Sequence, residues 1–157
     1  MDRSALMPKL PPQPVQEARD YRHPVLGGGL GDYAYQLLSD PGGITQIGAF
    51  IEILPPGAQS SFRHWHEGED EMVVMLEGAV VLVEDQEVPL QAGDVATWPA
   101  GLPVGHCLHN RSVAEARYLV IGSRRVQDVI HYPDHDLVTV KDGATRVYFH
   151  ADGRARG

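Results

Sequence analysis

The interpretation of this chain starts from one decapeptide, Phe62-Arg63-His64-Trp65-His66-Glu67-Gly68-Glu69-Asp70-Glu71. Residues two apart in a β-strand face the same side of the sheet, so His64 and His66 point the same way. The polar residues 67–70 suit a turn, and this turn brings Glu71 beside the two histidines at the start of the next strand. Two imidazoles and a carboxylate suit Mn, Fe, Co, Ni or Zn better than Mg or Ca. The decapeptide therefore predicts a transition-metal site.

A second stretch supplies one more histidine. Residues 93–101 have the character of a strand that runs into a Pro/Gly turn. Another strand begins near His106, and Leu108 and Asn110 share its face. We therefore predict that one metal ion has four ligands, His64, His66, Glu71 and His106.

Together the two stretches resemble the two signature motifs of the cupin superfamily. The positions that match the first motif are Gly57, His64, His66, Glu71 and Gly78. The positions that match the second are Gly93, Pro99, Gly101, His106 and Asn110. The chain departs from the motifs in two spacings, with six residues instead of five between Gly57 and His64, and four instead of two between Gly101 and His106. Both departures fall in turns and leave the ligand set intact.

The resemblance implies an all-β fold, the double-stranded β-helix or jelly roll of the cupin barrel. It also implies one divalent transition metal (Fe, Mn, Ni or Zn) near an open end of the barrel. The residues agree with an all-β fold, because short apolar segments alternate with turns and show no helical periodicity. The strands that we expect cover residues 33–38, 44–54, 60–66, 72–83, 88–92, 95–98, 106–110, 116–123, 138–140 and 145–150.

The length of 157 residues fits a single domain with a real core. We divide the chain into an extended N-terminal arm (1–20), one cupin β-barrel domain (21–150) and a frayed C-terminal tail (151–157). Four prolines between residues 8 and 14 exclude a helix in the arm. The arm is either disordered or lies along a neighbouring subunit. The resemblance implies a homodimer, since single cupin barrels often pair.

Composition limits the partners. The formal net charge is −8 and no basic stripe is present, so we expect no nucleic-acid partner. No apolar run approaches the length of a membrane span. No apolar stretch of signal-peptide length follows Met1, and we expect a cytoplasmic protein. Cys107 is the only cysteine, so an intrachain disulfide is impossible; we expect it to be a packed small hydrophobe that faces away from the metal.

Several residues are candidates for the pocket beside the metal. By strand parity, Phe62 and Met75 lie on the ligand side and would make the surroundings of the metal apolar. Tyr118 is either an acid/base catalyst or a core tyrosine. Arg124 and Arg125 end a strand, where they could clamp a carboxylate or phosphate of the substrate or form surface ion pairs.

Three further patterns receive a structural interpretation. In residues 44–54, we expect the aliphatic face to meet the core, while Glu52 on the opposite face is free to meet solvent and is not assigned to the site. Gly27-Gly28-Gly29 invites comparison with a phosphate-binding loop but lacks the Lys-Ser/Thr and the following helix. The acids and histidines of residues 131–136 straddle a proline, which favours a surface turn over a second metal site.

The ligands leave open several reaction classes, because a metal of this kind can polarise a carbonyl, generate hydroxide or, as iron, bind O₂. Our first hypothesis is a metal-dependent enzyme that acts on a small anionic metabolite, of the dioxygenase type or the sugar-phosphate isomerase or lyase type. The alternative is a non-catalytic module that binds or senses a small molecule. A barrel with a vestigial site is the third. Fold alone does not choose among these hypotheses.

Overall fold

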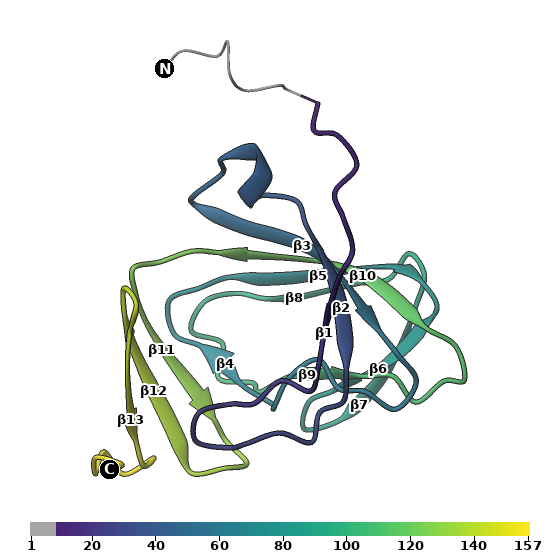
Figure 1. Ribbon diagram of the computed structural model, residues 1–157. Coiled ribbons are helices and arrows are strands. Elements are labelled where there is room, and N and C mark those ends of the chain that lie inside the picture. Colours follow the sequence, from purple (N-terminus) through teal and green to yellow (C-terminus); the bar gives the residue numbers. More distant parts are fainter. Residues whose placement is uncertain (1–8) are drawn as a thin grey trace.

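The computed structural model describes residues 9–157, which form thirteen strands and one short 3-10 helix, η2 (Asp40–Gly42), with no α-helix among them (Figure 1). Six strands make the largest sheet, in the order β1-β2-β3-β10-β5-β8. Their bounds are β1 (Gln16–Ala18), β2 (Tyr33–Leu37), β3 (Ile47–Leu54), β10 (Ala116–Ser123), β5 (Glu71–Glu77) and β8 (Val95–Trp98).

Two smaller sheets make the opposite wall. One is β13 (Thr145–Phe149), β12 (Leu137–Asp142), β11 (Gln127–Tyr132) and β4 (Trp65–His66), and the other is β7 (Glu87–Gln91), β6 (Ala79–Val83) and β9 (Cys107–His109). All pairs of neighbouring strands are antiparallel.

The two smaller sheets meet at a backbone bridge between His64 and His106, which exchange N–H···O bonds of 3.3 and 3.1 Å. Figure 1 shows the wall of β3, β10, β5 and β8 lying over β9, β6 and β7, with β11 to β13 closing one side. This two-walled arrangement confirms the all-β, double-stranded β-helix expectation. The apolar core lies between the walls, and its most buried large side chains include Leu54, Met75 and Tyr118.

The expected strand of residues 72–83 is in fact two strands. The break is at Gly78, whose φ of +74° belongs to the left-handed region that favours glycine. A Cβ at this position would lie 2.7 Å from the carbonyl oxygen of Glu115. The break sends β5 into the six-stranded sheet and β6 into the opposite wall. The expectation of one continuous strand was wrong, because the apolar pattern continues unchanged where the chain passes from one sheet to the other.

Strand β3 presents the opposite face to the one expected. Phe50 and Glu52 line the interior of the barrel, and only 8% of Glu52 is exposed. Ile47, on the aliphatic face, is 43% exposed. The register explains the orientation, because Glu52 is paired with Tyr118 of β10, and both side chains point inward.

Two segments differ from the sequence-based description. Part of the expected arm, Gln16–Ala18, pairs with β2 of the same chain, while residues 1–8 lie outside the described part. Residues 127–132, for which no strand was expected, form β11 between β4 and β12. Within the described residues, no helix is both long enough and apolar enough to cross a bilayer.

Candidate metal centre

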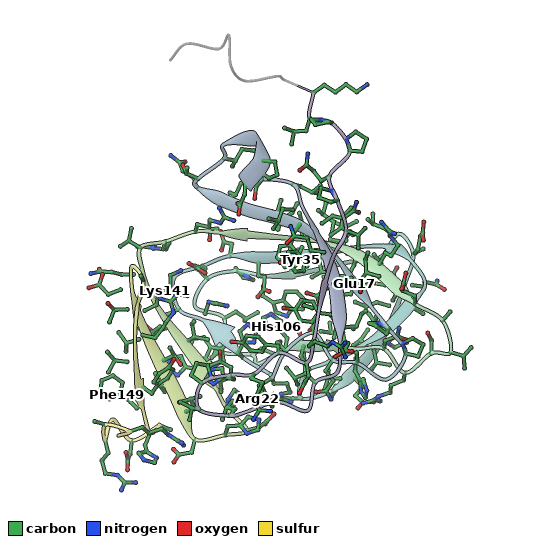
Figure 2. The ribbon with its side chains drawn as sticks, in the orientation of Figure 1. Glu17, Arg22, Tyr35, His106, Lys141 and Phe149 are labelled. Carbon is green, nitrogen blue, oxygen red and sulfur yellow. The ribbon has the colours of Figure 1, made fainter. Side chains whose placement is uncertain are left out.

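The predicted ligands converge inside the barrel. The ligand atoms of His64, His66 and Glu71 all lie within 4.8 Å of one another. His106 joins this group from the segment before β9, with its Nε2 2.8 Å from Glu71 Oε2 and its ring centroid 5.5 Å from that of His64. Figure 2 shows His106 in the interior, between the two walls. The turn at residues 67–70 places Glu71 beside the histidines, as the sequence suggested.

Each of the three histidines is held through Nδ1. The acceptors are the Phe62 carbonyl for His64 (2.8 Å), the Asp128 carboxylate for His66 (2.6 Å) and the Val104 carbonyl for His106 (3.3 Å). An imidazole whose Nδ1 is occupied in this way offers Nε2 to a cation, and such outer partners fix the ring orientation of metal-binding histidines. The donor set therefore fits a divalent transition metal.

The electrostatics also favour cation binding. Burial lowers the pKa of His64 to about 4, with smaller contributions from the neighbouring histidines and an opposing one from Glu71. Burial alone would raise the pKa of Glu71, but the hydrogen bond and charge of His106 and the charges of His64 and His66 lower it to about 2. At neutral pH the site thus offers a neutral His64 imidazole and an ionised carboxylate, the forms that bind metals.

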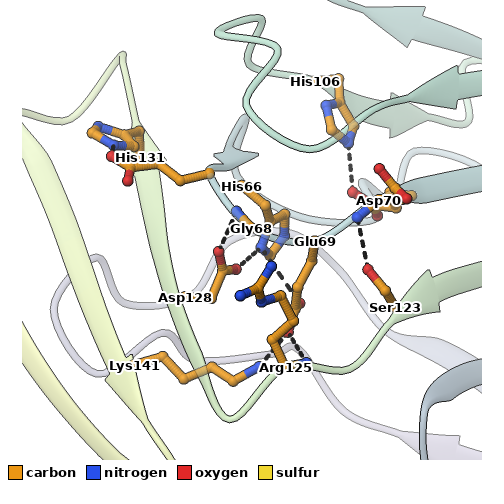
Figure 3. Close-up of polar contacts among 12 residues, drawn as sticks. His66, Gly68, Glu69, Asp70, His106, Ser123, Arg125, Asp128, His131 and Lys141 are labelled. Atoms are coloured by element: carbon orange, nitrogen blue, oxygen red, sulfur yellow. Dashed lines mark hydrogen bonds and ion pairs between the residues drawn. The ribbon is translucent and has the colours of Figure 1, made fainter.

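A polar network supports His66 from the outside (Figure 3). The side chain of Asp128 is fully buried, and its second oxygen accepts the backbone N–H of Gly68 at 2.8 Å. Glu69 lies 3.6 Å from His66 Nδ1 and accepts hydrogen bonds from Lys141 and the backbone N–H of Arg125. His66, Glu69 and Asp128 could themselves group around an ion. Both Asp128 oxygens and one Glu69 oxygen already accept hydrogen bonds from the protein, so we interpret the group as support for His66.

Three of the four candidate ligands, His64, Glu71 and His106, border a cavity of two adjoining chambers. The inner chamber, of about 150 Å³, is lined by His64, Glu71 and His106, and also by Glu52 and Tyr118. The outer chamber, of about 410 Å³, is rich in aromatic side chains. The residues common to both chambers are Phe50, Glu52, Ser60, Ser61 and His64. A ligand that enters the outer chamber can therefore extend one end to the metal centre.

Glu52 and Tyr118 form a buried pair in the inner chamber. The Tyr118 hydroxyl donates to Glu52 Oε1 at 2.5 Å. Burial raises the pKa of Glu52 to about 7, against the lowering effect of the Tyr118 hydrogen bond and with a further increase from the charge of Glu71. Burial raises the pKa of Tyr118 well above its usual value. Tyr118 was a sequence-based candidate, whereas Glu52 was missed because an acid on an alternating strand usually faces water.

The remaining candidates lie in different places. Phe62 lines the outer chamber. Met75 is buried in the core and lines neither chamber. Arg124 forms a surface ion pair with Asp40, and Arg125 packs against Gly68 outside the barrel. The structure does not bring these two arginines to the cavity, because they follow the end of β10 at the rim.

The single cysteine, Cys107, is buried, as predicted, and it belongs to the lining of the inner chamber. The charged groups that act on its thiol are Arg63, Asp134 and Arg111, none of which is a candidate ligand. Burial raises the pKa of its thiol to about 11. The thiol is therefore protonated at neutral pH and is a poor nucleophile or metal ligand.

Comparison with known proteins places this site in a family. A model described as "Cupin domain" matches residues 50–122. A cupin-superfamily structure from Silicibacter pomeroyi, described as a sugar phosphate isomerase, is 36% identical, with 91% of this chain and 92% of that chain covered and a TM-score of 0.83. The chain belongs to the cupin superfamily. In this cupin the two signature motifs meet at the His64–His106 bridge, which is why residues distant in sequence share one site.

Two further structures resemble this cupin. One, from Acidithiobacillus ferrooxidans, is named as a candidate sugar phosphate isomerase; it is 27% identical, with 85% of each chain covered and a TM-score of 0.78. The other, a predicted oxalate decarboxylase from Thermotoga maritima, is 25% identical, with 72% of this chain and 94% of that chain covered and a TM-score of 0.59. A comparison with curated proteins gives no match.

Proposed function

We propose that this cupin is a metal-dependent isomerase that moves a proton between adjacent carbons of a small hydroxy-carbonyl compound. One observation carries the proposal: three of the candidate ligands, His64, Glu71 and His106, line the same inner chamber as the Glu52–Tyr118 pair. The similarity to the Silicibacter pomeroyi protein, described as a sugar phosphate isomerase, supports the same reaction class.

The metal centre and the carboxyl pair have separate roles. A divalent cation held by His64, His66, Glu71 and His106 supplies Lewis-acid polarisation of the substrate carbonyl. Glu52 acts as the general base, because a buried carboxyl with a pKa of about 7 both accepts and returns a proton near neutral pH. The Tyr118 hydroxyl occupies Glu52 Oε1 and leaves Oε2 free to remove the proton from one carbon and return it to the next. The hydroxyl proton of the substrate passes at the same time to the former carbonyl oxygen, so that no proton is gained or lost overall.

The inner chamber has a size that suits this role. Its volume of about 150 Å³ is much smaller than the 410 Å³ of the outer chamber. This space accommodates the reactive end of a small carbonyl compound and little water beside it. The rest of the substrate occupies the outer chamber.

The first test is elemental analysis of protein purified without an affinity tag or chelator, with His106→Ala alongside. We expect about one equivalent of Fe, Mn, Ni or Zn per chain, lost in the variant, because four ligands define a single site. Absence of metal from both samples after reconstitution would contradict the metalloenzyme proposal.

The second test follows proton transfer directly. Metal-loaded protein is incubated in D₂O with aldoses, ketoses and their phosphate esters, and deuterium incorporation beside the carbonyl is followed by NMR. We expect incorporation that falls by about 10²–10⁴-fold in Glu52→Gln while metal content is unchanged. Metal binding without exchange would favour the binding-module alternative, and O₂ uptake by an iron-loaded sample would favour a dioxygenase.

A further inference from the structure

The outer chamber lacks the groups that usually hold a phosphate. Among the described residues that line the two chambers, none is a Lys or an Arg. The two acids, Glu52 and Glu71, face the inner chamber. Sites for phosphate esters depend on charge-assisted bonds from Arg or Lys, so the cavity offers a dianion no protein cation of this kind.

Arg146 and the backbone amides of the glycine-rich loop are engaged elsewhere. Arg146, whose charge acts on Tyr21 and Tyr132, donates to the backbone carbonyls of Gly143 and Thr145 at 2.8 and 3.0 Å. The glycine-rich loop of residues 27–31 is occupied from within the chain. Its backbone N–H groups at residues 29, 30 and 31 bond to the Asp20 carboxylate at 2.7, 2.8 and 3.0 Å. The loop therefore binds an anion that the chain itself supplies.

The charge balance adds to this argument. Burying an ionised group without a partner carries a large free-energy penalty. The chain has a formal net charge of −8, so its overall field repels anions. One divalent cation beside the Glu71 carboxylate leaves a net charge of about +1 at the site, too little to balance both a reacting oxygen and a distant phosphate.

The lining instead combines ring faces with hydroxyl groups. Tyr33 and Tyr35 stack on each other with ring centroids 6.0 Å apart and planes 29° apart. Tyr132 packs edge-on to His23 at 5.0 Å on the facing wall. Together with Tyr21, Ser60 and Ser61, these tyrosines give the chamber six hydroxyl-bearing residues. Ring faces pack against the C–H surface of a sugar, and hydroxyls bond to its hydroxyls, without any charge on either side.

We propose that the substrate of this cupin is an unphosphorylated sugar or a similar neutral polyol carbonyl compound, whose uncharged end occupies the tyrosine-lined outer chamber. The inference rests on the proposed isomerase function. The inference concerns the end of the substrate that lies in the outer chamber, away from the reacting carbons. It also departs from the sequence-based expectation of an anionic metabolite, because the arginines on which that expectation depended lie at the surface.

The test compares matched pairs of ligands on metal-loaded protein. Aldopentoses and aldohexoses are titrated by calorimetry beside their terminal phosphate esters, and turnover of each is followed by NMR. We expect at least one free sugar to bind about tenfold or more tightly than its phosphate ester, a difference of about 1.4 kcal/mol. Tighter binding of the phosphate esters would overturn the inference.

A gain-of-function variant makes the same test in reverse. Leu37 lines the outer chamber at the end of β2, and Leu37→Arg places a guanidinium there. We expect this variant to bind phosphate esters about tenfold more tightly than the parent protein. Val113→Arg is the matched control, because Val113 is 98% exposed and outside the lining. An equal effect of both variants would show that net charge and not the chamber governs phosphate binding, which contradicts the inference.

The outcomes separate this inference from the function on which it rests. Turnover of phosphate esters alone, with metal bound, would retain the isomerase proposal and refute the neutral substrate. Absence of binding and turnover for both ligand series would refute both proposals. Metal content, measured on the same samples of all variants, shows whether a loss comes from the metal centre.

Discussion

Asp128 is the residue through which the C-terminal strands act on the metal centre. Its buried carboxylate lies 2.6 Å from His66 Nδ1 and fixes the orientation of that ring. We predict that Asp128→Ala weakens metal affinity by about 10–100-fold. Asp128→Asn should weaken metal affinity less, because an amide oxygen still accepts the hydrogen bond from His66 Nδ1–H. The measurement is competition with a metal-binding dye.

The control for this prediction is Asp85→Asn, which removes a carboxylate that is 82% exposed and pairs with Arg63, not with a candidate ligand. Its metal affinity should equal that of the parent protein. Equal affinities for Asp128→Ala and the parent would show that the hydrogen bond to His66 has no part in metal binding.

Glu52 makes the stability of the metal-free protein depend on pH. The pKa of Glu52 is about 7 in the folded state, against 4.5 for an exposed glutamate. Between these values the folded protein holds a proton that the unfolded chain releases, so stability falls as pH rises through this window, by up to about 1.4 kcal/mol per pH unit. We predict that Glu52→Gln removes this slope and becomes increasingly stable relative to the parent from pH 5 to pH 8.

Urea unfolding of both metal-free proteins at several pH values measures the difference. A constant difference across the window would mean that Glu52 has the same pKa in the folded and unfolded states. Tyr118→Phe provides a second check, because it removes the hydrogen bond that lowers the pKa of Glu52 and should extend the slope to higher pH.

At the scale of single residues, sequence reasoning found the groups that belong to a local pattern. His64, His66 and Glu71 follow from strand parity and one turn. Asp128 and Glu52 could not be found in this way, because their roles depend on long-range pairing. Asp128 contacts a residue 62 positions away, and Glu52 contacts one 66 positions away.

Among the elements, the junction of β5 and β6 is the most constrained. Gly78 combines a positive φ with close contact to the Glu115 carbonyl. We predict that Gly78→Ala destabilises the protein by about 2–4 kcal/mol, because backbone strain and a steric clash act together. Gly143→Ala is the matched comparison, since Gly143 has φ +57° and no atom within 4 Å of an added Cβ. Gly143→Ala should lower the free energy of unfolding by only about 1–2 kcal/mol.

Urea unfolding of the two variants and the parent gives both values. Similar losses would show that the left-handed conformation alone accounts for the cost and that the contact at Gly78 relaxes freely.

Strand prediction succeeded where a period of two was bounded by turn residues. The segments expected at 33–38, 95–98, 116–123 and 145–150 correspond closely to β2, β8, β10 and β13. It failed for β11, whose residues Gln127–Tyr132 mix charged, polar and apolar side chains. Strand β11 forms because it pairs with β4 and β12, and its own sequence has no pattern that predicts this pairing.

For the molecule as a whole, metal binding should be coupled to folding. A ligand that binds only the folded state at 100 times its Kd stabilises that state by about 2.7 kcal/mol. We predict that Zn²⁺ or Mn²⁺ raises the Tm of chelator-treated protein, and that His106→Ala abolishes the increase. Calorimetric scans with and without each ion measure this change. An equal increase in the variant would indicate a metal site elsewhere.

The bridge between His64 and His106 has one more consequence. The segment that leads into β4 is joined to the segment of β9 by two isolated bridges, His64 with His106 and Gln59 with His109, and by a backbone hydrogen bond from Ser60 to Leu108. A metal ion bound by His64 from one segment and His106 from the other would cross-link the two smaller sheets. Removal of the metal ion would then weaken the junction between these two sheets. Amide hydrogens next to the His64–His106 bridge should exchange faster with solvent, while those of the six-stranded sheet keep their protection.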